Sequence, residues 1–442
     1  MTTDVTEAIG AMNIKTNGSV DKDQLTNNGE GTEESKLRAR LGKSSNKETS
    51  PYDWGTPGEL TEAEVDCFIK FREQVEGRGG EFRATVYCFG EEEGEIYALC
   101  RWLRARKFVY EDVIKMVEEA TECRKDARSK GFYPEPVDAL GCDSSLFHTQ
   151  YPQLYTGNAK NGAVLFISKP GVLNVDGMEC ITNLDGILKY HWHAMIHDFG
   201  SRLRAKKAED PNFKRFECFC ILDLEHLTTT QLSSRALSIV KEQSFIDSLC
   251  FPETMSKMII VNAPRFFAAS WKLIKGWLDA RTANKVEVIS SKSVSEAKLL
   301  ELVDADVLPS DYGGKFTDSK VILDSHIPKG MTRQNSELFY VRSNITHVVD
   351  VKANEKMEVI VFTNSTSGGK ISITDAAKGT IIVEGVGIKH VGDEAGQKPP
   401  TSLNLTPTTQ LTGPATYKIK VESNSNRLTA SRFFIATNYY PL

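Results

Sequence analysis

Two polar residues, Thr282 and Lys285, stand three positions apart, between an apolar helix-like run and the strand-like run VEVIS. A lysine at such a junction is either a solvated charge at a helix end or a donor directed at a ligand. A partly buried cation needs an acidic partner, because an unpaired buried charge is costly. Glu253, shortly before the strand-like run MIIVNAP, is a candidate partner for Lys285. Sequence spacing leaves both interpretations open.

The run CRWLRARKF, residues 100–108, concentrates positive charge at Arg101, Arg104, Arg106 and Lys107. The guanidinium group offers a forked set of donors that suits phosphate oxygens. The run therefore predicts a contact with a phosphate or an anionic lipid, and a solvated helix face is the alternative.

Motifs of enzymes and metal sites are absent from the sequence. There is no GxSxG nucleophile elbow, and LGKSS lacks the leading glycine of a phosphate-binding loop. His193 and His197 could share one helical face as zinc ligands, but no general-base glutamate stands between them. An amphipathic helix with exposed histidines is the simpler interpretation. We expect a non-enzymatic protein with no catalytic residue, no metal and no cofactor.

The segment RFFAASWKLIKGWLDA, residues 265–280, has a wider apolar arc than a surface helix needs. On a helical wheel Lys272 and Lys275 fall opposite two apolar stripes, which are Phe267, Trp271, Ile274 and Leu278, and Phe266, Leu273 and Trp277. A helix buried on two sides would explain this pattern. The sharper interpretation is a gate helix that closes an apolar cavity and swings outward against a bilayer.

The order of sequence patterns predicts five segments. Residues 1–54 are polar and expected to be disordered, and residues 55–130 show helical spacing of apolar residues. Residues 131–316 alternate strand-like and helix-length runs, which predicts an α/β fold with a mostly parallel sheet. A linker, 317–335, precedes short strand-like runs in 336–442, which predict an antiparallel β-sandwich.

Composition narrows the classes of partner. Lys plus Arg is 54 against 59 Asp plus Glu, so no bulk basic charge favours nucleic acid. No apolar run is long enough to span a bilayer, and the start lacks the pattern of a secretory signal. Nine cysteines without zinc-ligand spacing indicate reduced thiols. We therefore expect a cytoplasmic location.

Together these stretches resemble the CRAL-TRIO family, in particular its phosphatidylinositol-transfer branch. The resemblance covers about residues 55–316 and rests on GTPGEL, RWLRARKF, YPQLYTGNAKNG, ILDLEHL, FPETMSKMIIVNAPRFF, LDARTANKV and LPSDYGG, in this order. The tail, from FYVRSNITH to RFFIATNYY, is similar to a GOLD domain, as in proteins of the supernatant protein factor type. The resemblance implies a small helical lobe, an α/β lipid-binding domain with a gate helix, and a GOLD-like sandwich.

The resemblance also implies roles for single residues. It assigns headgroup binding to Arg106, Glu253, Thr282 and Lys285, places the gate at 265–280, and gives Gly313 and Gly314 a hinge role. Members that also bind phosphatidylcholine carry hydroxyl residues where Cys218 and Cys220 stand, although Tyr155 keeps an aromatic hydroxyl. Thiols are weak donors, so these three residues form only a possible second lipid subsite, and core packing is the alternative for the cysteines.

The resemblance implies a protein that carries a phosphatidylinositol-type phospholipid and exchanges it by transient contact with membrane surfaces, at the Golgi or endosomes. Two alternatives remain at this stage. One is a scaffold whose GOLD-like domain binds a Golgi or trafficking protein while the lipid acts as a switch. The other is a carrier of another apolar molecule, such as tocopherol or squalene.

Overall fold

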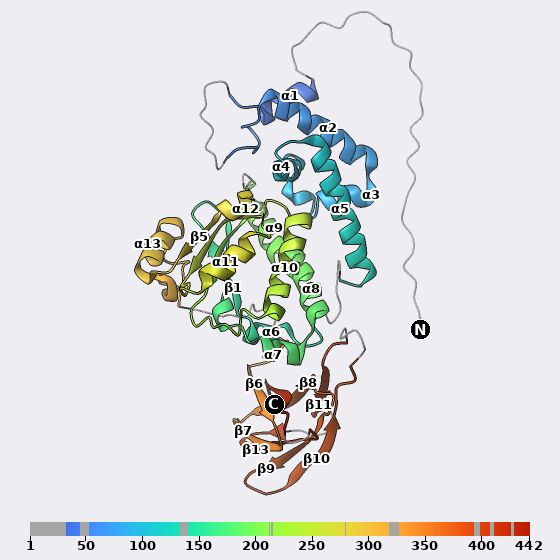
Figure 1. The fold of residues 1–442 in the computed structure, drawn as a ribbon, viewed down its shortest axis with the longest axis vertical. Coiled ribbons are helices and arrows are strands. Elements are labelled where there is room, and N and C mark those ends of the chain that lie inside the picture. The colour runs from blue at the N-terminus through green and yellow to red at the C-terminus, as the bar shows by residue number, and fades with distance from the viewer. Residues whose placement is uncertain are drawn as a thin grey trace, which may run out of the picture.

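The computed structural model describes residues 32–44, 53–132, 140–211, 213, 215–278, 280–317, 327–392, 398–406, 411–425 and 428–442. A helical lobe, a central α/β domain and a β-sandwich follow one another along the longest axis (Figure 1). This arrangement confirms the predicted fold class.

The helical lobe packs around large aromatic side chains, among them Phe68, Phe71 and Trp102. Thr61 and Glu64 form a reciprocal capping box that fixes the start of α2. The helices are α1 (Glu33–Leu41), α2 (Glu62–Arg78), α3 (Gly80–Val86), α4 (Glu95–Ala105) and α5 (Tyr110–Ser129).

Helix α1 corrects the expectation that residues 1–54 are disordered. Thr32 caps the helix by accepting a hydrogen bond from the Ser35 amide, and Leu41 is fully buried in the lobe. Backbone bonds from Gly58 and Leu60 to the Leu41 carbonyl hold this end in place. One well-placed leucine anchors a helix whose average composition is polar. Residues 1–31 and 45–52 lie outside the described residues.

The central domain alternates helices with the strands of one sheet. The helices are α6 (Ser144–Gln150), α7 (Val175–Ile181), α8 (Leu184–His193), a π-helical segment (Ala194–Phe199), α9 (Gly200–Glu209), α10 (Ser234–Cys250), α11 (Phe267–Lys275), α12 (Ala280–Asn284) and α13 (Lys292–Leu302). The strands are β1 (Gln153–Asn158), β2 (Val164–Ser168), β3 (Cys218–Asp223), β4 (Met255–Val261) and β5 (Val286–Ile289).

These strands lie in the order β1-β2-β3-β4-β5, and β2 to β5 pair in parallel, as predicted. Strand β1 pairs antiparallel with β2 at the edge and was not predicted, because its sequence, QLYTGN, lacks a continuous apolar run.

Alternate side chains of this sheet serve different purposes, because successive residues of a strand point to opposite faces. In β3, Phe219 and Ile221 belong to a closed core that includes Leu299 of α13. Cys218 and Cys220 point to the other face, which lines a cavity. The sheet is thus a solid core on one side and the wall of a hollow on the other.

The C-terminal domain consists of two antiparallel sheets with a shared apolar core, which confirms the predicted β-sandwich. Their strand orders are β10-β9-β13-β7 and β11-β8-β14-β6, and β12 pairs with β8. The strands are β6 (Arg333–Val341), β7 (Asn344–Val351), β8 (Glu355–Thr363), β9 (Gly369–Asp375), β10 (Ile381–Ile388), β11 (Thr401–Asn404), β12 (Leu411–Thr412), β13 (Ala415–Ser423) and β14 (Ser431–Pro441).

The domain boundary expected at residue 336 falls inside a strand, because β6 already begins at Arg333. Of the expected linker 317–335, residues 318–326 lie outside the described residues.

Candidate functional site

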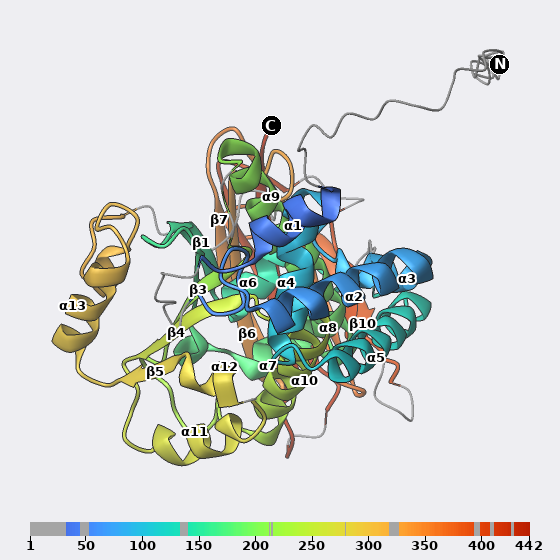
Figure 2. The ribbon, with the colours of Figure 1, turned by 90° about the horizontal axis from the view of Figure 1, so that it is seen from above.

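A cavity of about 410 Å³ lies between the free face of the sheet and helices α10 and α11. Figures 1 and 2 show these two helices side by side. Apolar side chains dominate its wall, for example Leu222, Met258 and Ile260 from the sheet and Val240 from α10. An apolar hollow with a few polar groups at one place is the usual form of a small-molecule site.

Helix α11 closes this cavity with one of its two predicted apolar stripes. Phe267, Trp271, Ile274 and Leu278 all line the hollow. On the other stripe, Phe266 and Leu273 are exposed, at 43% and 51%, whereas Trp277 is half-buried. The helix ends at Lys275 instead of continuing to residue 280. The wide apolar arc therefore divides into a cavity wall and a surface, and movement of the helix as a gate stays a prediction.

The polar end of the cavity is organised by Glu253, in the turn between α10 and β4. Its φ of +57° lies in the left-handed region, which non-glycine residues seldom adopt. Its carboxylate is bound by Arg281 and lies 3.2 Å from Lys285 Nζ and 3.3 Å from Arg104 Nη2. The structure thus brings together Glu253 and Lys285, the pair suggested by their charges.

Lys285 directly follows the last residue of α12. The end of this helix directs the lysine side chain toward the turn between α10 and β4, which contains Glu253. Its Nζ also donates to the Met255 carbonyl, at 2.8 Å. Thr282 lies on α12 one helical turn earlier, and both residues line the cavity. Their spacing of three places them on one side of the helix.

Among the arginines of residues 100–108, Arg104 pairs with Glu253, whereas the resemblance implied Arg106. Arg106 follows the last residue of α4, donates to the Ala105 carbonyl at 3.1 Å, and lines the cavity. Arg101 reaches the same turn as Arg104, because it donates to the Pro252 carbonyl at 3.1 Å. Arg101 and Arg104 are three apart and share a helix face. From the sequence, this spacing of three could have indicated that Arg104 reaches the same turn as Arg101.

Arg281 was missed altogether, although it stands next to Thr282. Its guanidinium lies 5.1 Å from the centre of the Trp54 ring while it binds Glu253. Trp54 comes from the helical lobe, so this contact joins segments that are distant in sequence. The sequence gives no distance between such segments.

The cations around Glu253 determine its ionisation state at this end of the cavity. Burial would raise the pKa of Glu253, but Arg104, Lys285 and Arg281 outweigh it and bring the pKa below the ordinary 4.5. Glu253 is therefore ionised at neutral pH and is shared among several cations. Arg104 is also paired with the buried Glu217, at 3.5 Å, so the positive charge that remains for an anionic ligand lies on Lys285 and Arg281.

The possible second subsite does come together on the cavity wall. Tyr155, Cys218 and Cys220 all line the hollow, and the two sulfur atoms lie 3.3 Å apart. A hydrogen bond with Cys220, together with burial, raises the pKa of the Cys218 thiol well above its ordinary value. The thiol therefore stays neutral and is a weak hydrogen-bond donor.

Another polar pair on the wall was not predicted. His191 of α8 and Asp247 of α10 both line the cavity, and His191 Nε2 lies 2.7 Å from Asp247 Oδ1.

The neighbouring His193 and His197, considered as zinc ligands, have ring centres 4.7 Å apart. The described residues include no group of three or more His, Cys, Asp or Glu side chains placed to hold a metal ion.

Gly313 and Gly314 lie beside α13. Gly313 has a left-handed φ of +87°, and a Cβ at Gly314 would meet the Leu308 carbonyl oxygen at 1.8 Å. Close packing accounts for both glycines, and a hinge role stays a prediction.

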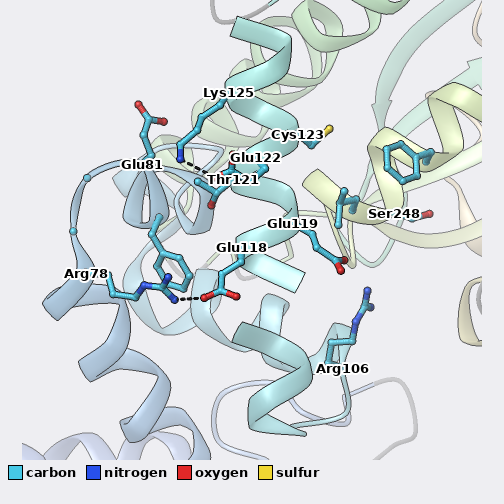
Figure 3. A pocket seen from close by; sticks show the side chains of 15 residues that line it. Arg78, Glu81, Arg106, Glu118, Glu119, Thr121, Glu122, Cys123, Lys125 and Ser248 are labelled. Atoms are coloured by element: carbon cyan, nitrogen blue, oxygen red, sulfur yellow. Dashed lines mark hydrogen bonds and ion pairs between the residues drawn. The ribbon is translucent and has the colours of Figure 1, made fainter. Parts of the chain in front are cut away.

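A larger hollow, of about 1000 Å³, lies outside the cavity between the α2–α3 turn, α5 and α10 (Figure 3). Its charged rim is partly neutralised, as in the pair Arg78–Glu118 at 2.8 Å. Arg106 and Ser248 line both hollows. We place the ligand in the smaller cavity because its wall is apolar and Glu253 and Lys285 stand at its end.

The fold has clear counterparts among known proteins. The model of the CRAL/TRIO domain matches residues 148–314. The SEC14 cytosolic factor of Candida glabrata is 30% identical over 264 residues, which span 59% of this chain and 81% of that protein. The chain belongs to the CRAL/TRIO family.

Two further matches have lower sequence identity. The phosphatidylinositol/phosphatidylcholine transfer protein SFH12 of Arabidopsis thaliana is 28% identical over 232 residues, which is 51% of this chain and 41% of that protein. The crystal structure of Sfh5 aligns at a TM-score of 0.45 with 17% identity, over 59% of this chain and 90% of that one. Within the described part of this chain, no helix is both long and apolar enough to cross a membrane.

Proposed function

We propose that this protein holds a phosphatidylinositol-type phospholipid in its cavity and exchanges it at membrane surfaces. The observation that carries the proposal is the pair of Lys285 and Glu253 at one end of an otherwise apolar hollow, with Arg104 holding Glu253 from outside the lining. The names of related proteins, a phosphatidylinositol/phosphatidylcholine transfer protein among them, point in the same direction.

The polar end suits a phosphorylated headgroup. Lys285 and Thr282 supply donors for phosphate oxygens, and charge-assisted bonds of this kind are the strong ones. Glu253 fixes the cations and can accept from an inositol hydroxyl, which a choline headgroup does not offer. Arg106 lines the same cavity and is a further cation within the lining.

The apolar wall supplies most of the affinity. Each methylene of an acyl chain that leaves water contributes roughly 0.8 kcal/mol, so two chains outweigh any single polar contact. The wall does not distinguish headgroups. Affinity and selectivity are therefore properties of different parts of the cavity.

Phosphatidylcholine is the poorer ligand in this proposal. At the second subsite, Cys218 offers a neutral thiol that lies 3.3 Å from the sulfur of Cys220, and hydrogen bonds from thiols are weak. Tyr155 is the remaining strong hydroxyl donor among these three residues.

The outer face of α11 suits transient contact with a bilayer. Phe266 and Leu273 are exposed there, and Lys272 and Lys275 are exposed on the adjoining surface of the same helix. Apolar side chains flanked by lysines favour the interface of an anionic membrane. The gate would open there, where the acyl chains pass from cavity to bilayer without entering water.

Two other functions stay predictions. A carrier of tocopherol or squalene would not need Lys285, and a scaffold would need a Golgi or trafficking protein that binds the sandwich. Location in the cytoplasm with reversible membrane association belongs to the proposal, as does the absence of catalysis.

Native mass spectrometry of the purified protein, followed by extraction of its lipid, tests the proposal. We expect phosphatidylinositol in the wild type and its loss from Lys285→Ala. Thermal denaturation of both forms controls for unfolding. A sterol or isoprenoid that is retained by the variant would overturn the proposal.

A further inference from the structure

The sandwich packs directly against the lipid-binding domain through helix α7. Cys180 and Ile181 of α7 share an apolar cluster with Phe362 and Phe434 of the sandwich. Asn364 of the sandwich donates to the Glu179 carbonyl at 3.2 Å. Helix α7 thus forms a large part of the contact surface between the two domains, as its position next to the sandwich in Figure 1 illustrates. Helix α6 adds Leu146 to the same apolar cluster.

An ionic cluster reinforces this contact. Arg432 of the sandwich lies 2.7 Å from Asp176 Oδ1 and 3.2 Å from Glu179 Oε2. Tyr340 donates to Asp176 Oδ2 at 2.6 Å. Arg235, from the lipid-binding domain, binds the same carboxylates and lies 3.1 Å from Asp176 Oδ1. The two arginines belong to different domains and share both carboxylates.

The cluster is connected to the cavity on two sides. Met178, between the two acidic residues, is buried and lines the cavity. Arg235 is the second residue of α10, and the next turns of that helix line the cavity with residues such as Ala236 and Val240. The position of α7 therefore sets both a part of the cavity wall and the start of α10.

The chain just before α10 touches the predicted gate. Leu227 and Leu232 share an apolar cluster with Phe267 and Trp271 of α11. A continuous path of contacts thus runs from the sandwich through the ionic cluster and the start of α10 to the cavity side of α11.

We propose that the docked sandwich is a working part of the lipid site, in which Arg432 positions α7 and, through Arg235, the start of α10. Undocking loosens the wall opposite the gate and speeds lipid exchange. Arg432 is a positioning residue, because it touches no part of the cavity lining. This inference rests on the proposed function.

Sharing of carboxylates explains why Arg432 affects Arg235. When Arg432 is removed, Asp176 and Glu179 face each other with one cation fewer, and like charges at short range repel. Both carboxylates then lose their fixed positions, and Arg235 loses its fixed anchor. Groups in one network are coupled in this way, whereas distant groups act independently.

Arg432→Ala in the full chain tests the inference. The measurement is transfer of fluorescent phosphatidylinositol between vesicles, together with the ratio of phosphatidylinositol to phosphatidylcholine in the loaded protein. We expect exchange to be faster by about threefold or more, as for loss of a coupled pair, with an unchanged lipid ratio. Exchange at the wild-type rate would overturn the inference.

Arg333→Ala is the matched control. Arg333 pairs with Glu355 at 2.8 Å inside the sandwich, and its side chain is 27% exposed against 24% for Arg432. This variant should leave the exchange rate unchanged, and equal acceleration in both would indicate general loss of stability and contradict a positioning role. If Arg432→Ala fails to fold, Tyr340→Phe removes one bond of the cluster and should accelerate exchange in the same direction.

Amide hydrogen exchange tests this inference independently of the proposed function. If the purified protein carries no phospholipid, the proposed function fails. Amide protection in residues 224–236 and in α11 still reports on the contact path, because it needs no ligand. Lower protection in Arg432→Ala than in Arg333→Ala supports the path, and equal protection contradicts it.

Discussion

The two parts of the cavity are built in opposite ways. The apolar wall comes from regular elements, in which every second residue of β3 and one stripe of α11 face the hollow. The polar end is assembled from separate segments, since Arg104 belongs to the helical lobe, Glu253 to a turn and Lys285 to the junction between α12 and β5. The wall thus depends on local periodicity, whereas the polar end depends on how the lobes pack.

This difference gives the two parts different sensitivities. A substitution in the wall removes some apolar contact area and leaves the remainder in place. A substitution at the polar end leaves other buried charges without a partner, which is costly. We therefore expect single changes to have larger and more selective effects at the polar end.

The largest effect is expected for Glu253→Gln. It leaves Arg104, Arg281 and Lys285 without their shared carboxylate, and breaking a buried pair costs about 3–5 kcal/mol. Glu253 is 9% exposed, and the cations around it are only partly exposed, so water replaces the lost carboxylate incompletely. Denaturant unfolding of the full chain measures the loss, and a loss below about 1 kcal/mol would show that the cluster does not stabilise the fold.

A comparison of Arg104→Gln with Arg106→Gln sharpens the assignment of the arginine. Arg104 does not line the cavity and acts on the ligand through Glu253. Removal of a charged hydrogen-bond partner costs roughly 1.5–3 kcal/mol, so release of Glu253 in Arg104→Gln should lower phosphatidylinositol loading about tenfold. Arg106, which bonds the carbonyl of its neighbour, should matter less. Loading is measured by native mass spectrometry, and the reverse order would restore the role that the resemblance implied for Arg106.

The wall is tested by Trp271→Ala against Leu273→Ala on the same helix. Trp271 lines the cavity, whereas Leu273 is 51% exposed. Loss of the indole should weaken all diacyl lipids by a similar factor, at roughly 1–3 kcal/mol. Leu273→Ala should leave loading unchanged and reduce binding to anionic vesicles. Equal loading defects in both variants would contradict the division of α11 into two faces.

The smallest effect is expected from pH. A carboxyl whose pKa is lowered in the folded state stabilises that state above its unfolded pKa, and this contribution is lost as the pH falls through the folded pKa. The pKa of Glu253 lies below 4.5, so a change from pH 7 to pH 5 should leave loading unaltered. Loss of loading within this range would show that the cluster of Arg104, Arg281 and Lys285 does not hold Glu253 ionised.

Regular features of the site could be predicted from the sequence for a physical reason. Period-two alternation placed Cys218 and Cys220 on one face, and helical spacing placed Phe267, Trp271 and Ile274 on one stripe. Both follow from geometry within one element. The pair of Glu253 and Lys285 followed from the cost of an unpaired buried charge.

The features that escaped prediction depend on distances between elements. The contact of Arg104 with Glu253 needs the packing of the helical lobe. Arg281 meets Glu253 only because α12 lies against the turn before β4, and His191 meets Asp247 only because α8 lies against α10. Helix α1 escaped because one buried side chain, Leu41, outweighs a polar composition. Likewise, the cluster around Asp176 and Arg432 joins residues that are 256 positions apart.

The central claim is that the polar end selects the headgroup while the wall supplies affinity. The most direct test offers the wild type, Lys285→Ala and Trp271→Ala to vesicles with equal amounts of phosphatidylinositol and phosphatidylcholine, and measures the ratio of the two lipids loaded. We predict that Lys285→Ala lowers this ratio, whereas Trp271→Ala lowers loading of both lipids and leaves the ratio as in the wild type. An unchanged ratio in Lys285→Ala, or a changed one in Trp271→Ala, would contradict the claim.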